Sequence, residues 1–295
     1  MVIEAEYFQI IQCIKKEFDI FEDYFKNRLK TEIPEKFKEI LEFYFSKKGK
    51  RIRPALIFLL LNALGHEVCE KHYLLAFANE MIHNATLLHD DIIDNAQFRH
   101  SLPSINALYD NKLAVLAGDY LLSLALGALS EIGDSKVIKI HTTSISRLIS
   151  GEIGQYFEKG EKVTIEHYLQ KSRNKPAELF RAGLLSAVEI SQNPANCGEI
   201  EAFSLNFGTA FQIFNDLAGI AEDIANGVST APVIYYSQIT KVPPDIKSLQ
   251  NSTAIDQTKA LISEYLRRAI ENIAFIEDNQ YKKAIVDLCK IINQC

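Results

Sequence analysis

Three aspartates within five residues are the most distinctive chemical feature of the sequence. Asp90, Asp91 and Asp94 lie in the stretch HDDIIDNAQFRH (89–100), directly after an apolar run. On a helix, Asp90 and Asp94 are one turn apart and share a face, with Asp91 about 100° around the axis. Carboxylates are the ligands that Mg²⁺ prefers, together with water and phosphate oxygens. Because such a cluster is costly on an apolar helix, it predicts a magnesium site in preference to a solvated helix end.

A run of positive charge precedes another apolar segment. KKGKRIRP (47–54) contains five cations in seven residues and ends in Pro54. Such runs also occur on surfaces that bind nucleic acids or membranes. Here the run adjoins a core-like helix, and Lys and Arg together bind a diphosphate well, the Arg in bidentate fashion. The residues alone leave a fixed anion pocket and a solvated patch equally open.

Further cations follow in two places. Arg99 comes after the aspartates, and YLQKSRNKPAELF (168–180) contains Lys171 and Lys175. Alone, each is as compatible with a surface as with a ligand. Pro176 disfavours α geometry at Lys175, so we expect a helix break that lets this lysine point into a cavity. Together with the aspartates, these patches predict metal-assisted cleavage of a carbon–oxygen bond in a diphosphate that carries a hydrocarbon tail.

A second acidic stretch, FQIFNDLAGIAEDIANG (211–227), is less regular. Asn215, Gly219 and Asp223 have the spacing i, i+4 and i+8, which places them within about 80° on one helix. Asn215 and Asp223 would hold a third Mg²⁺, with water at Gly219. Asp216 lies about 100° from that face, where it would assist. The alternative is a polar helix end, where Asn, Asp and Gly are common.

The elements that must position these residues are helices. There are only 13 Gly and 8 Pro in 295 residues, and no stretch shows a convincing alternation with period two. Periodicity predicts helices over 7–29, 33–49, 54–64, 72–97, 111–131, 135–158, 164–191, 197–221 and 256–293, with 240–256 as the main loop. We therefore expect one all-α domain over 1–295, a bundle of about ten or more helices around a central cavity.

Composition disfavours several classes of protein. The net charge of −6 argues against a general nucleic-acid binder. Five scattered cysteines favour a reducing, cytoplasmic compartment over a disulfide framework or a zinc site. The N-terminus lacks the pattern of a secretory signal. The apolar runs 55–64 and 121–129 are shorter than the ~20 residues that cross a bilayer, so we expect no transmembrane segment.

Several motifs, in one order, resemble those of the trans-isoprenyl (polyprenyl) diphosphate synthases. GKRIRPAL (49–56) resembles the isopentenyl diphosphate-binding segment of that family, and residues 82–126 resemble its first aspartate-rich region. The other motifs are GEIGQ (151–155), Lys175-Pro176-Ala177, FGTAFQ (207–212) and TAPVIYY (230–236). The resemblance covers roughly residues 40 to 240. It implies an all-α isoprenoid synthase fold and a homodimer, with a heterodimer as the alternative.

The resemblance also implies roles for individual residues. The residues implied to bind two Mg²⁺ ions are Asp90, Asp91 and Asp94, and those of an altered second site are Asn215, Asp216 and Asp223. The isopentenyl diphosphate pocket would contain Lys50, Arg53 and His83, and contacts to the allylic diphosphate would come from Arg99, Lys175 and Gln212. The implied reaction ionises the allylic diphosphate and adds the isopentenyl double bond to the cation. A proton then passes to the released diphosphate, and Lys175 acts with the first aspartates in catalysis.

Small residues before the aspartates bear on product length. Ala85 lies five residues ahead of Asp90, at a place where a bulky aromatic blocks chain growth in the family. Ala85, with Thr86 beside it, implies an open tunnel and a medium- or long-chain, octaprenyl-type product. Ordinary helix packing is the alternative explanation of this alanine.

The sequence departs from the family pattern at two places. Residues 215–219 read Asn-Asp-x-x-Gly where a second Asp-Asp-x-x-Asp is expected, and the segment from there to Thr230 is short and lacks the usual lysine. His100 and Ser101 replace the Arg and Gly expected after Arg99. The isopentenyl diphosphate pocket is therefore less cationic above about pH 6.5, where an unperturbed His is mostly neutral.

Three functions are compatible with these residues. The first is a trans-prenyltransferase that condenses isopentenyl diphosphate with an allylic prenyl diphosphate. The second is a non-catalytic or regulatory subunit of a heteromeric synthase, against which the intact first cluster argues. The third is a class I terpene synthase, which the spacing of Asn215 and Asp223 supports. Lys50, Arg53 and His83 favour the first function, because only a second diphosphate substrate requires them.

Overall fold

Helices make up most of the described chain, and the predicted all-α class is confirmed. The structure, a computed structural model, describes residues 2–46, 49–99, 102–157, 163–192, 196–240 and 242–293. Its helices are, in chain order, α1 (Val2–Ile10), the 3-10 helix η1 (Ile11–Ile14), α2 (Lys15–Glu32), α3 (Glu35–Phe45), α4 (Ile52–Ala63), α5 (Glu70–Ile93), α6 (Ile105–Leu108), α7 (Asn111–Ile132), α8 (Ser135–Phe157), α9 (Ile165–Asn174), α10 (Pro176–Ile190), α11 (Cys197–Ala218), α12 (Ile220–Ala225), α13 (Ala231–Ile239), α14 (Ile246–Gln250), α15 (Thr253–Asn272) and α16 (Gln280–Asn293). Two-residue strands β1 (Phe98–Arg99) and β2 (Leu102–Pro103) pair in antiparallel fashion.

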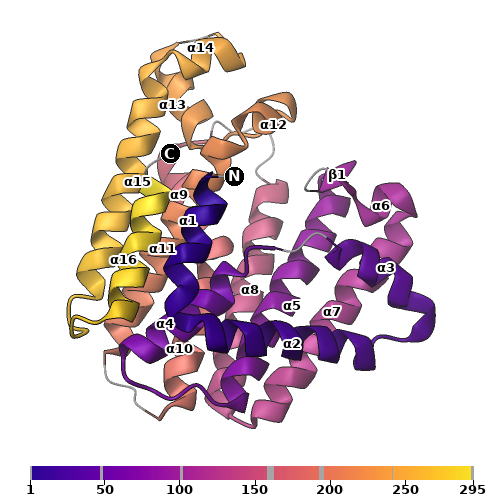
Figure 1. The fold of residues 1–295 in the computed structure, drawn as a ribbon. Helices are drawn as coiled ribbons and strands as arrows, with labels where there is room; N and C mark the ends of the chain where they lie inside the picture. Colours follow the sequence, from indigo (N-terminus) through magenta and orange to yellow (C-terminus); the bar gives the residue numbers. More distant parts are fainter. Residues whose placement is uncertain are drawn as a thin grey trace.

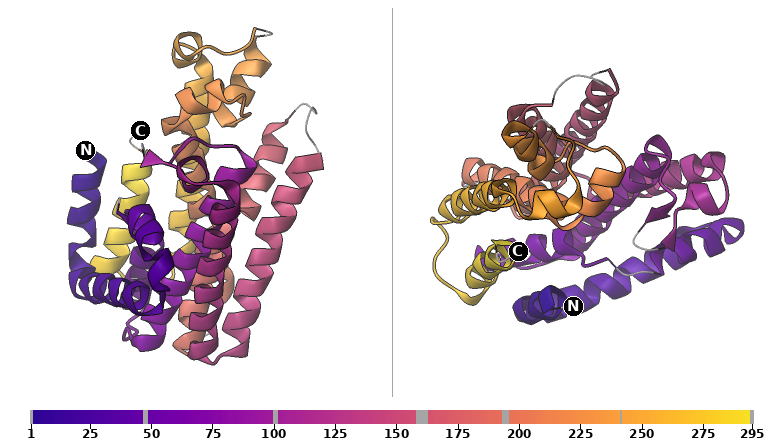
Figure 2. Two further views of the ribbon diagram at one scale, coloured as in Figure 1. Left: turned by 90° about the vertical axis from the view of Figure 1, so that its right-hand side faces the viewer. Right: turned by 90° about the horizontal axis from the view of Figure 1, so that it is seen from above.

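The long helices stand side by side, and the N-terminal helices cover one flank. Helices α5, α7, α8 and α11 run upright in Figure 1, while α2 lies across them near the lower end. Seen from above, the indigo N-terminal helices lie along one side and α12–α14 lie toward the other (Figure 2). Helix α4 is central, because every side chain from Ala55 to Leu61 is at most 1% exposed. A helix that is apolar all round has to be buried in this way.

Helix α7 is the one helix among the described residues that is long and apolar enough to cross a membrane. In this structure it packs along α5 and buries Ala114, Ala117 and Leu121. A Cβ atom at Gly118 would collide with the imidazole of His89, so glycine permits this close approach. The small residues of α7 therefore serve its packing against α5, whereas only 39% of its apolar window is buried.

The predicted single helix over 256–293 is wrong. Helices α15 and α16 are separate, with residues 273–279 between them. Ile273 and Ile276 in this connection are 0% and 3% exposed. Their burial continues the apolar period across the turn, which explains why periodicity did not reveal the break. The loop predicted over 240–256 also contains the short helix α14, where Asp245 accepts a hydrogen bond from the backbone N–H of Ser248 at 3.0 Å.

The helix predicted over 7–29 is divided as well. Helix α1 and helix α2 are joined by η1, and Ile14 at the junction has φ −115° and ψ 21°. The two helices run in very different directions in Figure 1. Ile11 and Ile14 are 4% and 0% exposed, so the bend itself is part of the core and keeps the helical spacing of apolar residues.

A second, smaller apolar cluster lies at one end of the bundle. It consists of Ile220, Val233, Tyr236, Leu249 and Ala254, which come from α12 to α15. Figure 1 shows α12–α14 at the same end of the molecule as β1, which follows α5. This end therefore gathers the segments that contain both aspartate-rich stretches.

Candidate active site

The first aspartate cluster lies where α5 ends. The helix stops at Ile93, four residues before the predicted end, because Asp94 caps it with φ −89° and ψ −1° and Asn95 takes a left-handed conformation. Asp91 is buried, Asp90 is half-buried and Asp94 is exposed. The three carboxylates thus share one helix end but face different surroundings.

Asp90 faces a lysine from the junction of two other helices. The predicted break at Lys175 is confirmed, because α9 ends at Asn174 and α10 begins at Pro176. The Nζ atom of Lys175 lies 3.0 Å from Oδ2 of Asp90 and 2.7 Å from Oε1 of Glu152 on α8. Burial raises the pKa of the Asp90 carboxyl, and Lys175 partly offsets this. Burial lowers the pKa of Lys175, but the two carboxylates outweigh it, so the net shift is upward.

Glu152 received no role from the sequence. It belongs to the GEIGQ motif (151–155), which was matched to the family by sequence without a role for any of its residues. Glu152 lies near Asp90 because of how α8 and α5 are arranged in the fold. Residue spacing along the chain does not predict that arrangement. The signal that could have identified Glu152 was its place in a family-like motif, because no partner had been assigned to this carboxylate.

Asp91 holds Arg99 in place. Nε of Arg99 donates to Oδ1 of Asp91 at 2.9 Å, and the Nη2 atom of the same guanidinium bonds the same oxygen. The side-chain amide of Asn106 donates to the backbone carbonyl of Asp91 at 3.3 Å. Arg99 still keeps 31% of its side chain exposed. Its position is therefore fixed while part of the cation stays accessible to an anion.

Asp216 is the centre of the second acidic cluster. The hydroxyl of Tyr168 donates to Oδ2 of Asp216 at 2.5 Å, and the amide of Gln212 donates to Oδ1 at 2.7 Å. Burial raises the pKa of Asp216 to about 7; the Tyr168 hydrogen bond opposes this shift and the charge of Asp223 adds to it. Tyr168 was missed from the sequence, because 48 residues separate it from Asp216.

One turn residue interrupts the helix predicted through Asn215, Gly219 and Asp223, although backbone hydrogen bonds from Gly219 to Asn215 (2.8 Å) and from Asp223 to Gly219 (3.2 Å) bridge it. Helix α11 ends at Ala218, and Gly219, with φ −93° and ψ 9°, separates it from α12. Asn215 is exposed at the end of α11, whereas burial raises the pKa of Asp223 to about 6. Asp216 is therefore the residue that shares its surroundings with Asp223. The role of Asn215 as a metal ligand stays a prediction.

Lys171 lies between the two acidic clusters. Burial lowers its pKa and the charge of Lys175 lowers it further, while Glu152, Asp216 and Asp94 oppose the shift. In the described part of the chain, no three His, Cys, Asp or Glu side chains are grouped closely enough to hold a metal ion as they stand. The two lysines instead supply the positive charge between the carboxylates.

The residues nevertheless fit Mg²⁺ in their chemistry. All the acidic groups present hard oxygen atoms, which is the donor type that Mg²⁺ requires. The raised pKa values of Asp90 and Asp216 show that burial leaves both carboxylates short of positive charge. A divalent cation would supply that charge.

The cationic run before α4 divides into residues with different surroundings. Arg51, at φ 54°, donates from Nη1 to Glu80 at 2.7 Å and from Nε to Glu22 at 3.3 Å, so it holds the loop to α5 and α2. Arg53 is 9% exposed, with its guanidinium carbon 4.7 Å from the ring centre of Phe180. Burial lowers the pKa of Arg53 to about 10, against the opposing charge of Glu80.

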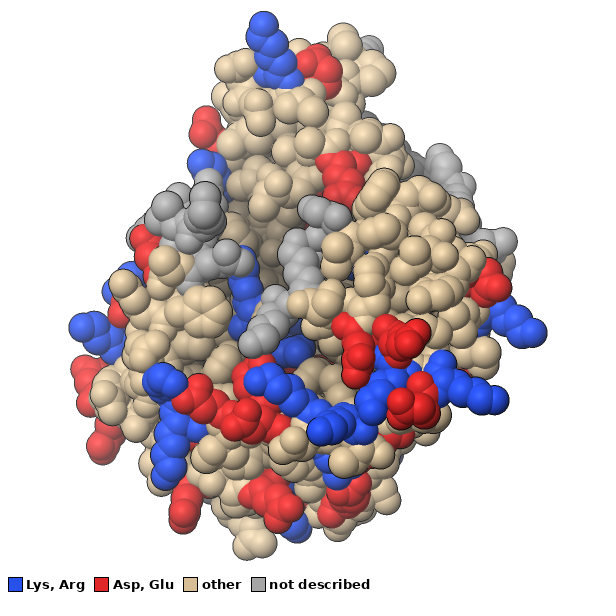
Figure 3. Space-filling view, turned by 45° about the vertical axis from the view of Figure 1, so that its right-hand side comes forward, with Lys and Arg blue, Asp and Glu red and all other residues tan. Residues whose placement is uncertain are grey.

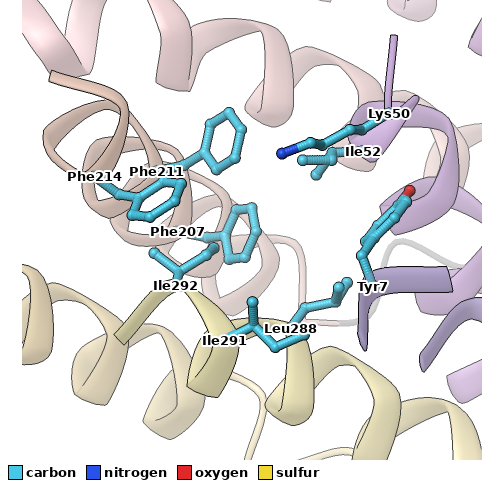
Figure 4. A pocket seen from close by; sticks show the side chains of 9 residues that line it. All are labelled: Tyr7, Lys50, Ile52, Phe207, Phe211, Phe214, Leu288, Ile291 and Ile292. Atoms are coloured by element: carbon cyan, nitrogen blue, oxygen red, sulfur yellow. The ribbon is translucent and has the colours of Figure 1, made fainter. Parts of the chain in front are cut away.

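Lys50 is exposed and lines a pocket together with apolar side chains from α4, α11 and α16 (Figure 4). Lys47 and Lys48 of the same run lie outside the described residues. Figure 3 shows acidic and basic side chains mixed over the lower part of one face, with Lys or Arg atoms in a recess between two larger lobes. The described cations of the run 47–54 therefore have different surroundings, and Arg51 has a structural role.

The remaining predicted residues lie along α5. His83 is half-buried, and the hydroxyl of Thr86 donates to its backbone carbonyl at 2.7 Å. Ala85 is 2% exposed and belongs to the main core. His100 and Ser101, which replace the expected Arg and Gly, lie outside the described residues.

Replacing Asp216 with Asn is expected to raise the melting temperature at pH 8 in the absence of Mg²⁺. The pKa of Asp216 is raised to about 7, whereas an Asp in an unfolded chain has a pKa of about 3.9. Its contribution to stability is therefore fully present below pH 4 and is lost as the pH rises through 7. The amide in the variant carries no charge, so the advantage of Asp216→Asn over the parent shrinks between pH 8 and pH 5. Thermal unfolding at both pH values checks this.

The control for this change is Asp278→Asn, because Asp278 is exposed and Lys282 lowers its pKa. It is expected to give no stabilisation at pH 8. A stability gap between Asp216→Asn and the parent that is the same at both pH values would contradict the electrostatic account. With Mg²⁺ added, the parent should gain more stability than Asp216→Asn.

Comparison with known proteins places this arrangement in one family. A family model described as polyprenyl synthetase matches residues 34–267. The decaprenyl-diphosphate synthase of Dictyostelium discoideum is 36% identical over 280 residues, which is 86% of this chain and 61% of that protein. This chain is thus shorter than that relative.

Solved structures agree with the fold. The heptaprenyl diphosphate synthase of Staphylococcus aureus matches with a TM-score of 0.87 at 25% identity, over 95% of this chain and 98% of its own. A polyprenyl synthase of Caulobacter crescentus, solved with calcium and isoprenyl diphosphate, matches with a TM-score of 0.86 at 21% identity, over 98% of both chains. The family model covers most of this chain, and the predicted resemblance is confirmed. The chain belongs to the polyprenyl synthetase family.

Proposed function

We propose that this chain is a trans-prenyltransferase that condenses isopentenyl diphosphate with an allylic prenyl diphosphate to give a medium- or long-chain polyprenyl diphosphate. The observation that carries this proposal is the presence of two separate cationic sites. One contains Lys175 and Arg99, held by Asp90 and Asp91, and the other lies at the start of α4. An enzyme with a single diphosphate substrate needs only the first. The names of the long-chain synthases to which the chain is similar support the same activity.

Mg²⁺ is the metal that we propose for the site, with two or three ions held by the carboxylates of α5, α11 and α12. The residues best placed to hold it are Asp90, Asp94, Asp216 and Asp223, with Asp91 committed to Arg99. Bound Mg²⁺ stabilises the negative charge on a leaving diphosphate. The calcium in the related Caulobacter structure supports the use of a divalent cation.

The chain itself binds and orients the allylic diphosphate. Lys175 is fixed by Asp90 and Glu152 and Arg99 by Asp91, so both cations meet the diphosphate without having to be ordered first. When the carbon–oxygen bond breaks, its electron pair leaves with the diphosphate. The double bond of isopentenyl diphosphate then forms the new carbon–carbon bond with the allylic cation, and the released diphosphate takes the proton that is lost.

The alternative is a terpene synthase, which the spacing of Asn215 and Asp223 favours but which has no use for a second cationic site. Release of pyrophosphate separates the functions. With Mg²⁺ and farnesyl diphosphate, we expect release only when isopentenyl diphosphate is present. Release without isopentenyl diphosphate would favour a terpene synthase, and no release in either case would favour a non-catalytic subunit.

We also propose that two copies of the chain associate through α7 and α8. The outer faces of these helices carry exposed apolar residues at separations of 4 or 11 residues, which repeat on one helical face: Val115 and Leu126 on α7, and Ile138, Ile149 and Ile153 on α8. Exposed apolar stripes of this extent are typical of subunit interfaces.

Replacing Ile149 with Glu is expected to convert a dimer into monomers, because a charge would be buried without a partner in the interface. Light scattering coupled to size-exclusion chromatography measures the mass. The control is Val242→Glu, since Val242 is 63% exposed but lies on the segment between α13 and α14. A parent chain that is monomeric, or an Ile149→Glu variant that stays dimeric, would contradict this interface.

A further inference from the structure

A small pocket beside Lys50 contains a tyrosine from the N-terminal helix. The cavity measures about 30 Å³ and is lined by Phe207 and Phe211 of α11, Leu288 of α16, Lys50, and Tyr7 of α1. Figure 4 shows the Lys50 ammonium directed into the space between Phe211 and Tyr7, which approach from opposite sides. The pocket is therefore an apolar cavity with polar atoms on the side formed by Lys50 and Tyr7.

The hydroxyl of Tyr7 is buried without a hydrogen-bond partner. Tyr7 is 3% exposed, and its oxygen contacts no acceptor or donor in the described part of the chain. An unpaired buried hydroxyl is costly, and native structures nearly always give such groups a partner. A phenylalanine at position 7 would fill this apolar space equally well without a hydroxyl. The hydroxyl thus needs a hydrogen-bond partner that the described part of the chain does not provide.

The nearby carboxylates are already engaged. Burial raises the pKa of Tyr7, and the charges of Glu80 and Glu22 raise it further. Both carboxylates are bound to Arg51, at 2.7 Å for Glu80 and 3.3 Å for Glu22. Tyr7 consequently keeps its proton and offers it as a donor, and Arg51 neutralises the negative charge that would repel an anion.

A second unused donor lies in the same region. The Nε atom of Arg53 is buried and has no hydrogen-bond partner in the described chain. Glu80 acts electrostatically on both Tyr7 and Arg53, so the two donors lie near the same carboxylate. Tyr7 and Lys50 line the pocket and Arg53 lies near the same Glu80, so these donors gather beside carboxylates that Arg51 already engages. An anion with several oxygen atoms supplies the missing acceptors.

We propose that the hydroxyl of Tyr7 donates a hydrogen bond to the diphosphate of the second substrate, so that helix α1 forms part of that substrate's binding site. The assignment of this anion to isopentenyl diphosphate rests on the proposed function. Tyr7 lies outside residues 34–267, which the family model matches. It also lies ahead of the segment in which the sequence motifs were found.

The test is Tyr7→Phe, which removes one oxygen and keeps the ring. We expect the KM for isopentenyl diphosphate to rise about 10-fold or more, as for a lost hydrogen bond to a charged group. The KM for farnesyl diphosphate and kcat at saturation should change less than twofold. The control is Tyr73→Phe. Tyr73 lies on the first turn of α5, at the opposite end of that helix from Asp90, and packs against Phe58. It should leave both KM values unchanged.

A binding measurement separates this proposal from the proposed function. Calorimetry with inorganic pyrophosphate should show weaker binding to Tyr7→Phe than to the parent. Without ligand, the melting temperature of Tyr7→Phe should equal or exceed that of the parent, because a buried unpaired hydroxyl has been removed. If the parent makes no product, the proposed function fails, and the pyrophosphate comparison still decides the role of Tyr7. Unchanged pyrophosphate affinity, or equal increases in both KM values, would overturn the proposal.

Discussion

Changing Asp90 and Asp94 together to Asn lowers kcat at least about 10³-fold, the scale expected when preorganised charge stabilisation of a transition state is removed. The two carboxylates occupy one helix end, and Asp90 also orients Lys175 at 3.0 Å. Their loss removes metal ligands and leaves Lys175 with Glu152 alone. Product formation is measured at saturating concentrations of both substrates and over a Mg²⁺ titration.

The double change is compatible with folding. Burial already disfavours the charged form of Asp90, so a neutral amide of the same shape relieves this cost. The matched control is Asp19→Asn with Asp23→Asn, two exposed aspartates one turn apart on α2. This control should keep the parent rate. An Asp90/Asp94 variant that is folded and equally active would refute the magnesium assignment.

Changing Ala85 to Phe shortens the product. Ala85 is 2% exposed and lies five residues ahead of Asp90 on α5, about 7.5 Å along the helix axis. We expect the growing chain to run along α5 past this position, where a phenyl ring would narrow its path. We expect the longest product of the variant to fall from a medium- or long-chain to a short-chain prenyl diphosphate, as read by mass spectrometry.

Overpacking of the core is the competing effect. Added volume in a buried site costs about 1–3 kcal/mol, which the melting temperature reports. Ala85→Leu adds less volume and should shorten the product by fewer units, so that product length follows side-chain size. Unchanged product lengths in folded Phe and Leu variants would show that Ala85 serves helix packing alone.

Local rules predicted the features that depend on neighbours in the chain. Apolar periodicity found the long helices but not the short helices α6, α12, α13 and α14. The restriction that Pro176 places on Lys175 predicted the break between α9 and α10. The breaks it missed, at η1 and between α15 and α16, are formed by buried isoleucines that keep the helical spacing. Apolar periodicity reflects which residues are buried, and buried residues can keep a helical spacing where the helix itself is interrupted.

Partnerships across the fold were not predictable in the same way. Glu152 meets Lys175 and Tyr168 meets Asp216 only because separate helices pack together. The second metal site was assigned to Asn215, Asp216 and Asp223 from spacing and resemblance, neither of which indicates the contact of Asp216 with Tyr168. Charge counting likewise grouped Arg51 with its neighbours, although ion pairs to Glu80 and Glu22 give it a structural role.

The most direct test of the proposed activity follows the carbon of isopentenyl diphosphate into the product. The chain is incubated alone with Mg²⁺, unlabelled farnesyl diphosphate and ¹³C-labelled isopentenyl diphosphate, and the products are analysed by mass spectrometry. We predict a ladder of prenyl diphosphates in which each member is one labelled five-carbon unit heavier than the last. An unlabelled hydrocarbon or alcohol, or no product at all, would contradict a prenyltransferase.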